Sequence, residues 1–132
     1  MPPRISVITL GVADMARSLA FYRDGLGLPA REDKPPVIYF ELQGTWLALF
    51  PRDGLAGYAG VGAGGEGFDG VTLSCNVSSA DEVDRMVRAA EAAGARVTSA
   101  PRKAGWGGYT GWFADPDGHL WEIVYNPRPF IP

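Results

Sequence analysis

FADPDGHLWEIVYNP, residues 113–127, is the most informative stretch of this chain. Its centre, Asp115-Pro116-Asp117-Gly118, combines a proline that sets φ, aspartates that can cap backbone N–H groups, and a glycine suited to the left-handed position. The flanking segments, Tyr109–Ala114 and Leu120–Tyr125, are rich in aromatic and β-branched residues, which favour strands. The stretch therefore predicts a hairpin of two antiparallel strands.

Glu122 is the acidic residue that this hairpin places in an otherwise apolar strand. Successive side chains of a strand point to opposite faces. One face then carries Trp121, Ile123 and Tyr125, and the other, more polar face carries Glu122, Val124 and Asn126. An ordinary solvent-facing strand has the same pattern. A carboxylate without hydrogen bonds in an apolar setting can instead act as a general base, which makes Glu122 a candidate catalytic residue.

The composition is that of one ordinary globular domain, with 132 residues, 46% of them hydrophobic and 20% charged. A net charge of −3 with scattered basic residues argues against a nucleic-acid partner, and no apolar stretch is long enough to span a membrane. No export signal is visible, so we expect a cytoplasmic protein. The single cysteine, Cys75, cannot form an internal disulfide and is predicted to be a buried structural thiol.

The order of elements predicted for the first part of the chain is strand, helix, strand, strand. Asp14 can cap a helix over Met15–Leu26, which Gly27 ends. The strands around it are predicted over Ile5–Val12, Val37–Leu42 and Thr45–Phe50. The glycine-rich segment that follows, Arg52–Phe68, is expected to be a loop that serves as a linker or a lid.

A similar order of strands and helix then repeats. A strand over Gly70–Val77 leads to a capping box at Ser79–Glu82, a helix to Ala93, a strand near Arg96–Ser99 and the hairpin. We therefore predict an α+β fold of two βαβββ modules in tandem, a fold-level duplication. The single domain, 1–132, divides into module one at 4–51, a linker loop at 52–68, module two at 69–127 and a tail at 128–132. A groove shared by two such modules is a common kind of ligand site.

Two stretches carry a resemblance to a known family: TLGVADMARSLAFYRDGLGL, residues 9–28, and FADPDGHLWEIVYNP. The chain resembles, over nearly its whole length, the vicinal oxygen chelate superfamily, which includes glyoxalase I, extradiol dioxygenases and bleomycin resistance proteins. The resemblance implies that the paired modules form a cupped, partly open barrel. It also implies a homodimer.

In metal-dependent members of that family, four ligands point into the cup. The resemblance places these positions at Val7, Gly70, Glu122, and either Leu47 or Ala48. Only Glu122 has a side chain that binds metals well, and the sole histidine, His119, lies in the hairpin turn. We therefore expect neither a bound metal nor another cofactor.

Strand parity and a second loop supply the candidate ligand-binding residues. The two-residue alternation of the strands places several polar side chains on the same side as Glu122. There they form either the floor of a ligand site or a network whose members hydrogen-bond only to one another. On the glycine-hinged segment 100–112, Trp106 and Tyr109 are suited to closing over a flat ligand, whereas Trp112 and Trp121 are expected in the core and Arg102 and Lys103 in solvent. The candidate ligand-binding residues are Thr9, Tyr39, Thr72, Ser74, Asn76, Trp106, Tyr109 and Glu122.

Two classes of function follow from these observations. The first is a metal-independent binding protein of the glyoxalase and bleomycin resistance type, which holds a small, partly aromatic ligand in its cup. The alternative is an enzyme, either a lyase or isomerase that uses Glu122 as general base or a divergent metal-dependent enzyme that uses it as a ligand. The sequence leaves open whether any reaction is catalysed, and the expected partners are a small molecule and a second copy of the chain.

Overall fold

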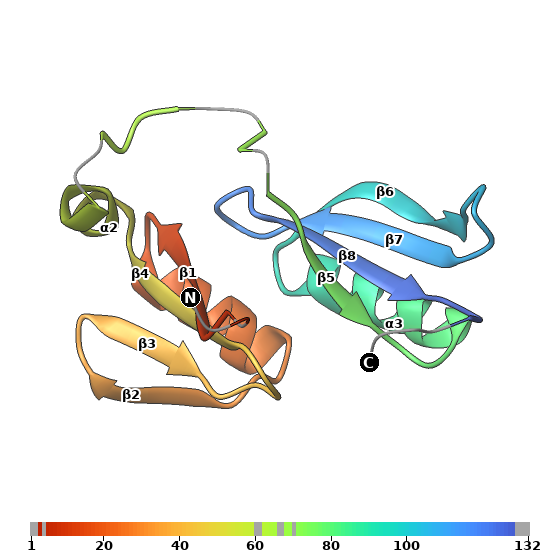
Figure 1. The fold of residues 1–132 in the computed structure, drawn as a ribbon, viewed down its shortest axis with the longest axis horizontal. Coiled ribbons are helices and arrows are strands. Elements are labelled where there is room, and N and C mark those ends of the chain that lie inside the picture. The colour runs from red at the N-terminus through yellow and green to blue at the C-terminus, as the bar shows by residue number, and fades with distance from the viewer. Residues whose placement is uncertain (1–2, 4, 60–61, 66–67, 70, 129–132) are drawn as a thin grey trace. The chain divides into compact units, whose positions relative to one another are not determined.

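The computed structural model describes residues 3, 5–59, 62–65, 68–69 and 71–128. The chain divides into two compact units, Met1–Gly67 and Phe68–Pro132. Each unit contains a four-stranded mixed sheet, with α1, η1 and α2 in the first unit and α3 in the second (Figure 1), which confirms the predicted α+β fold of two tandem modules. Within the described residues the hydrogen-bonded strands form two separate sheets, one in each unit.

The first unit has its strands in the order β1-β4-β3-β2, with β1 parallel to β4 and the other neighbours antiparallel. Its elements are β1 Val7–Val12, α1 Met15–Leu19, η1 Ala20–Gly25, β2 Ala30–Lys34, β3 Val37–Phe40, β4 Trp46–Pro51 and α2 Arg52–Ala59. The single predicted helix is thus an α-helix that continues as the π-helix η1. Strand β2 was not predicted, because its sequence, AREDK, lacks the apolar alternation of a half-buried strand and its residues are largely exposed.

Two aromatic residues of η1 form the centre of the core of this unit. Phe21 and Tyr22 are both almost fully buried, with their ring centroids 5.0 Å apart in an edge-to-face arrangement. Tyr22 also lies 5.9 Å from the ring of Phe40 on β3. The helical segment therefore covers the sheet face that carries Phe40, and the alternate residues of β3 and β4 point to the other face.

Helix α2 corrects the expected loop at 52–68, since Arg52–Ala59 is helical. The glycines of this helix disfavour it by intrinsic propensity, but its packing on β1 compensates. A Cβ at Gly11 on β1 would lie 3.3 Å from the Cα of Arg52 and 3.4 Å from a methyl of Leu55. The absence of a side chain at Gly11 thus lets the helix approach the strand closely.

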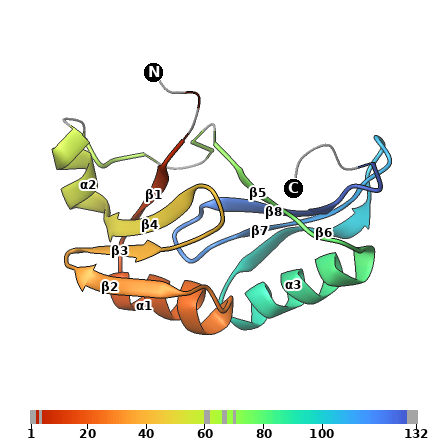
Figure 2. The same ribbon diagram turned by 60° about the horizontal axis from the view of Figure 1, so that its bottom comes forward.

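The second unit has strand order β5-β8-β7-β6, with β5 parallel to β8. Its elements are β5 Leu73–Asn76, α3 Ala80–Ala92, β6 Arg96–Lys103, β7 Tyr109–Ala114 and β8 Leu120–Tyr125. The bounds of β7 and β8 are as predicted, whereas β5 begins later and Gly70 lies outside the described residues. Helix α3 packs against β6, β7 and β8 and so covers one face of this sheet (Figure 2).

The turns and caps of the second unit follow the chemistry of the sequence. Asp115 is buried and accepts hydrogen bonds from the backbone N–H groups of Asp117 and His119 at 2.9 and 2.8 Å, while Gly118 has a φ of +90°. Ser79 caps α3 by accepting from the backbone N–H of Glu82 at 3.1 Å. The other half of the capping box differs from the standard form, because the Glu82 carboxylate accepts from the backbone and hydroxyl of Ser78.

None of the helices among the described residues is both long enough and apolar enough to cross a membrane.

Candidate functional site

The face of the second sheet opposite α3 carries two rows of aligned side chains, which we call the polar face. The strand register aligns Ser74, Glu122, Trp112 and Ser99 in one row and Asn76, Val124, Thr110 and Arg102 in the next. Side chains of paired residues in a sheet point to the same face. The register of β5 with β8 therefore brings Ser74 and Asn76 to the same face as Glu122, as parity predicted.

Glu122 is hydrogen-bonded on this face. The hydroxyl of Ser74 donates to Oε1 of Glu122 at 2.9 Å. Among the residues that the structure describes, Oε2 has no hydrogen-bond partner, and the side chain is only partly buried. Glu122 thus has one oxygen held in place by its neighbour and a second that can accept a hydrogen bond from a ligand.

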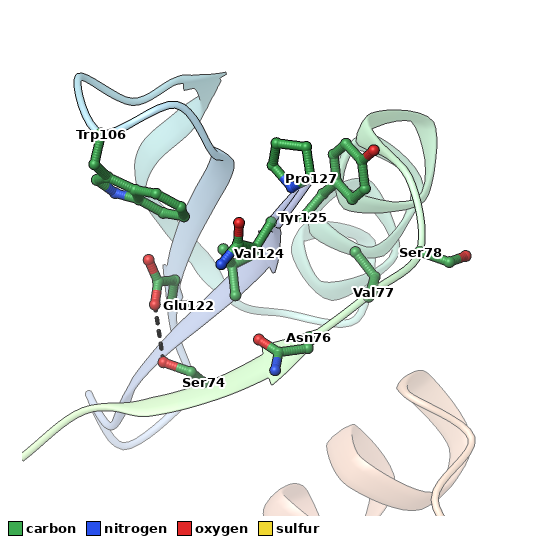
Figure 3. Close-up of a pocket in the computed structure, with 10 residues that line it drawn as sticks. Ser74, Asn76, Val77, Ser78, Trp106, Glu122, Val124, Tyr125 and Pro127 are labelled. Atoms are coloured by element: carbon green, nitrogen blue, oxygen red, sulfur yellow. Dashed lines mark hydrogen bonds between the residues drawn. The ribbon is translucent and has the colours of Figure 1, made fainter. Parts of the chain in front are cut away.

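A pocket of about 690 Å³ lies over this carboxylate. Figure 3 shows Trp106 on the loop between β6 and β7, Glu122 and Ser74 joined by their hydrogen bond, and Asn76 further along β5. The lining residues are Ser74, Asn76, Val77, Ser78, Trp106, Glu122, Val124, Tyr125, Asn126 and Pro127. The volume is within the usual range for a small-molecule site, about 300–1,000 Å³.

Trp106 is held by the glycine-rich loop between β6 and β7. The backbone N–H of Ala104 donates to the carbonyl of Gly108 at 2.7 Å, and Gly107 has a φ of +105°, which favours glycine. A Cβ at Gly108 would overlap the Trp106 ring. The indole therefore occupies space that only a glycine at position 108 leaves free, while 59% of the residue remains exposed.

A second pocket, of about 350 Å³, shares Glu122 and Trp106 with the first. Its remaining lining is mostly polar and includes two cations, Arg102 and Lys103, which the sequence had led us to expect in solvent. Both residues are exposed, yet they also line this pocket. Glu122 and Trp106 thus lie at the boundary between a largely apolar pocket and a cationic one.

The structure corrects the expected positions of two aromatic residues. Tyr109 lines neither pocket, because its hydroxyl donates to Oδ1 of Asp84 on α3 at 2.7 Å and it points to the helix side. This hydrogen bond raises the pKa of Tyr109. Trp112, expected in the core, pairs with Glu122 and lines the smaller pocket. Counting residues back from the hairpin turn would have placed Trp112 beside Glu122.

The remaining predicted ligand-binding residues, Tyr109 apart, are not in the lining of either pocket. Thr9 and Tyr39 belong to the first unit, where both align with Ala48 on the sheet face opposite Phe40. Thr72 is exposed, precedes β5 and lines neither pocket. Of the predicted set, the structure thus brings together Ser74, Asn76, Trp106 and Glu122.

Two tandem modules, each built on a four-stranded mixed sheet, with pockets on one face of the second sheet, define a class of small α+β proteins. Residues 4–123 match the profile of the Glyoxalase/Bleomycin resistance protein/Dioxygenase superfamily. The chain belongs to this superfamily, which confirms the resemblance seen in the sequence.

Solved structures similar to this one include two bacterial proteins. A glyoxalase-related enzyme from Fulvimarina pelagi is 33% identical, with 95% of this chain and 89% of that chain covered and a TM-score of 0.85. A glyoxalase/bleomycin resistance protein/dioxygenase from Nocardioides is 27% identical, with 99% and 91% covered and a TM-score of 0.76.

A curated relative matches over a shorter stretch. Metallothiol transferase FosB from Staphylococcus haemolyticus is 44% identical over 45 residues. The matched stretch is 34% of this chain and 32% of that protein, so it spans about a third of either one.

The donor set in the described residues does not fit the metal site that the resemblance implies. Val7 and both candidates on β4, Leu47 and Ala48, have no donor atoms in their side chains, and Gly70 lies outside the described residues. Leu47 aligns with Phe40 on the helix side, whereas Ala48 lies on the opposite face. In the part of the chain that the structure describes, no three His, Cys, Asp or Glu side chains are grouped so as to hold a metal ion. Glu122 is the one implied position with a carboxylate.

Proposed function

We propose that this protein binds a small, partly aromatic molecule on the polar face of its second sheet, without a metal ion in the site. The observation that carries the proposal is the position of Glu122. Its Oε2 has no hydrogen-bond partner among the described residues, and its side chain lines the same pocket as the exposed indole of Trp106. A planar ring that carries a hydrogen-bond donor complements both groups.

Each lining group has a distinct part in this proposal. The Trp106 ring offers a flat apolar surface for stacking, which contributes about 0.5–1.5 kcal/mol beyond the area that it buries. Val124 supplies an apolar floor, and the amide of Asn76 can both donate and accept. Ser74 keeps Oε1 of Glu122 occupied, so that the ligand's donor is directed to Oε2.

Binding of 4-hydroxybenzamide, a planar neutral probe with a phenol donor, tests the proposal. We expect its addition to shift the Trp106 indole resonance and the backbone amide resonances of the pocket in ¹⁵N-resolved NMR spectra. In Trp106→Ala the shifts of those backbone amides should disappear. Trp46→Phe is the matched control, because Trp46 lies in the first unit, where its ring centroid is 6.0 Å from that of Tyr39. A probe that perturbs the spectrum of Trp106→Ala as strongly as that of the wild type would contradict the proposal.

A second candidate function is acid–base catalysis by Glu122 as a lyase or isomerase. The uncommitted Oε2 of Glu122 favours it, as does the likeness to the glyoxalase-related enzyme from Fulvimarina pelagi. The variant Glu122→Gln separates the two functions, since the amide keeps the shape and the ability to accept a hydrogen bond. If catalysis is the function, the variant loses turnover and still binds substrate, whereas a binding protein shows only a change in affinity.

A further inference from the structure

The smaller pocket on the polar face contains charge that the proposed binding of a neutral ring does not use. Arg102 aligns with Thr110 on β7, in the same row as Val124 and Asn76, so the register places it on the polar face. Lys103 follows it at the end of β6 and also lines the pocket. Two adjacent cations therefore lie beside a pocket in a chain whose net charge is −3.

These two cations differ from the arginines of the first unit. Arg23 pairs with Asp24 and Glu32 at 2.8 and 3.2 Å, and Arg31 pairs with Asp33 and Glu41 at 2.9 and 2.7 Å. Within the described part of the chain, neither Arg102 nor Lys103 has an ion-pair or side-chain hydrogen-bond partner. Their charges are thus available to an anion from outside the chain.

The other lining groups suit an anion as well. The smaller pocket also contains Ser99 and the buried Thr110, whose hydroxyls can donate hydrogen bonds. A guanidinium binds a carboxylate or phosphate through two parallel hydrogen bonds, and a neighbouring ammonium adds charge without a fixed direction. The lining of the smaller pocket contains two basic side chains, Arg102 and Lys103, and one acidic side chain, Glu122, which lies at the boundary with the larger pocket. Basic groups therefore outnumber acidic ones in this pocket.

We infer that the smaller pocket is an anion subsite, so that the ligand is a planar organic anion whose ring lies against Trp106 and whose carboxylate, or similar group, lies at Arg102 and Lys103. This inference rests on the proposed function, because it assigns the ring to the larger pocket. It adds a chemical class, an aromatic acid that also carries a hydrogen-bond donor for Glu122. The shared residues Trp106 and Glu122 allow one ligand to occupy both pockets.

The test compares 4-hydroxybenzoate with neutral 4-hydroxybenzamide by NMR titration of the whole chain. The two probes share the ring and the phenol donor and differ in the anion. We expect the benzoate to bind about tenfold more tightly than the benzamide, because one charge-assisted hydrogen bond contributes about that much to affinity. In Arg102→Gln and Lys103→Gln this preference should fall. Arg96→Gln is the matched control, since Arg96 lies on the same strand, is exposed and lines neither pocket.

The outcomes separate the inference from the proposed function. If the benzamide shifts the Trp106 resonance and the benzoate binds no more tightly, the ring site stands and the anion subsite is wrong. If the benzoate preference survives in Arg102→Gln and Lys103→Gln as it does in Arg96→Gln, the cations of the pocket do not hold the anion, and the inference is again overturned. If neither probe shifts Trp106, the proposed function fails and the inference fails with it.

Discussion

The variant Gly111→Ala tests how closely α3 packs on the second sheet. A Cβ at position 111 on β7 would lie 2.9 Å from both a Pro101 ring carbon and a Val87 methyl, and 3.4 Å from the Pro101 backbone. Val87 is 3% exposed and belongs to α3, so the helix cannot yield without disturbing the core. Such overpacking costs about 1–3 kcal/mol.

Part of this cost is offset because alanine restricts the unfolded chain, by about 0.4–1 kcal/mol. The centres of these two ranges differ by about 1.3 kcal/mol, which is the net loss that we expect in the free energy of unfolding. Urea denaturation followed by far-ultraviolet circular dichroism measures it. At a slope of roughly 2 kcal/mol per M, the midpoint should fall by about 0.5–1 M.

Gly108→Ala is the matched control, since the same methyl is added three residues earlier. It would overlap the Trp106 ring, but that residue is 59% exposed and its ring can swing away. We expect a stability change below about 0.5 kcal/mol, accompanied by altered tryptophan fluorescence and weaker binding of a planar probe. The reasoning is refuted if Gly111→Ala is as stable as the wild type, or if Gly108→Ala loses as much stability as Gly111→Ala.

Four further predictions concern the second unit and the assembly. The hydrogen bond to Asp84 raises the pKa of Tyr109, so the stability that this bond gives the fold is present at neutral pH and is lost as the pH rises through that pKa. In Asp84→Asn an ultraviolet titration should therefore show a tyrosine that ionises at lower pH than in the wild type. Ser79→Ala removes the N-cap of α3 and should cost about 1 kcal/mol in urea denaturation, and an unchanged midpoint would contradict the cap. Burial raises the pKa of the Cys75 thiol, so alkylation by iodoacetamide at pH 8 should be slower in the folded protein than in urea. We also propose that the protein is a homodimer, which light scattering coupled to size-exclusion chromatography would show as twice the mass of 14.1 kDa.

The hairpin of β7 and β8 was predictable because its signals are local. Turn chemistry at Asp115 and Gly118 involves residues only a few positions apart, and the alternation around Glu122 follows from the two-residue period of a strand. The repeat of a strand, a helix and further strands was readable for the same reason, although β2 of the first module was not. Helix α2 was missed because its glycines argue against a helix, and its packing on β1 and β4 outweighs them.

The sequence by itself determined the two modules, the fold class and the face on which Glu122 lies, because these depend on periodicity and on turns formed by neighbouring residues. Only the tertiary structure decided which side chains surround that carboxylate. The bond from Ser74 spans 48 positions, the Tyr109 hydroxyl finds its partner Asp84 on a helix packed beneath the sheet, and Arg102 reaches the polar face through a register shift in β6. Each depends on the register and packing of segments distant in the chain, which no local pattern encodes.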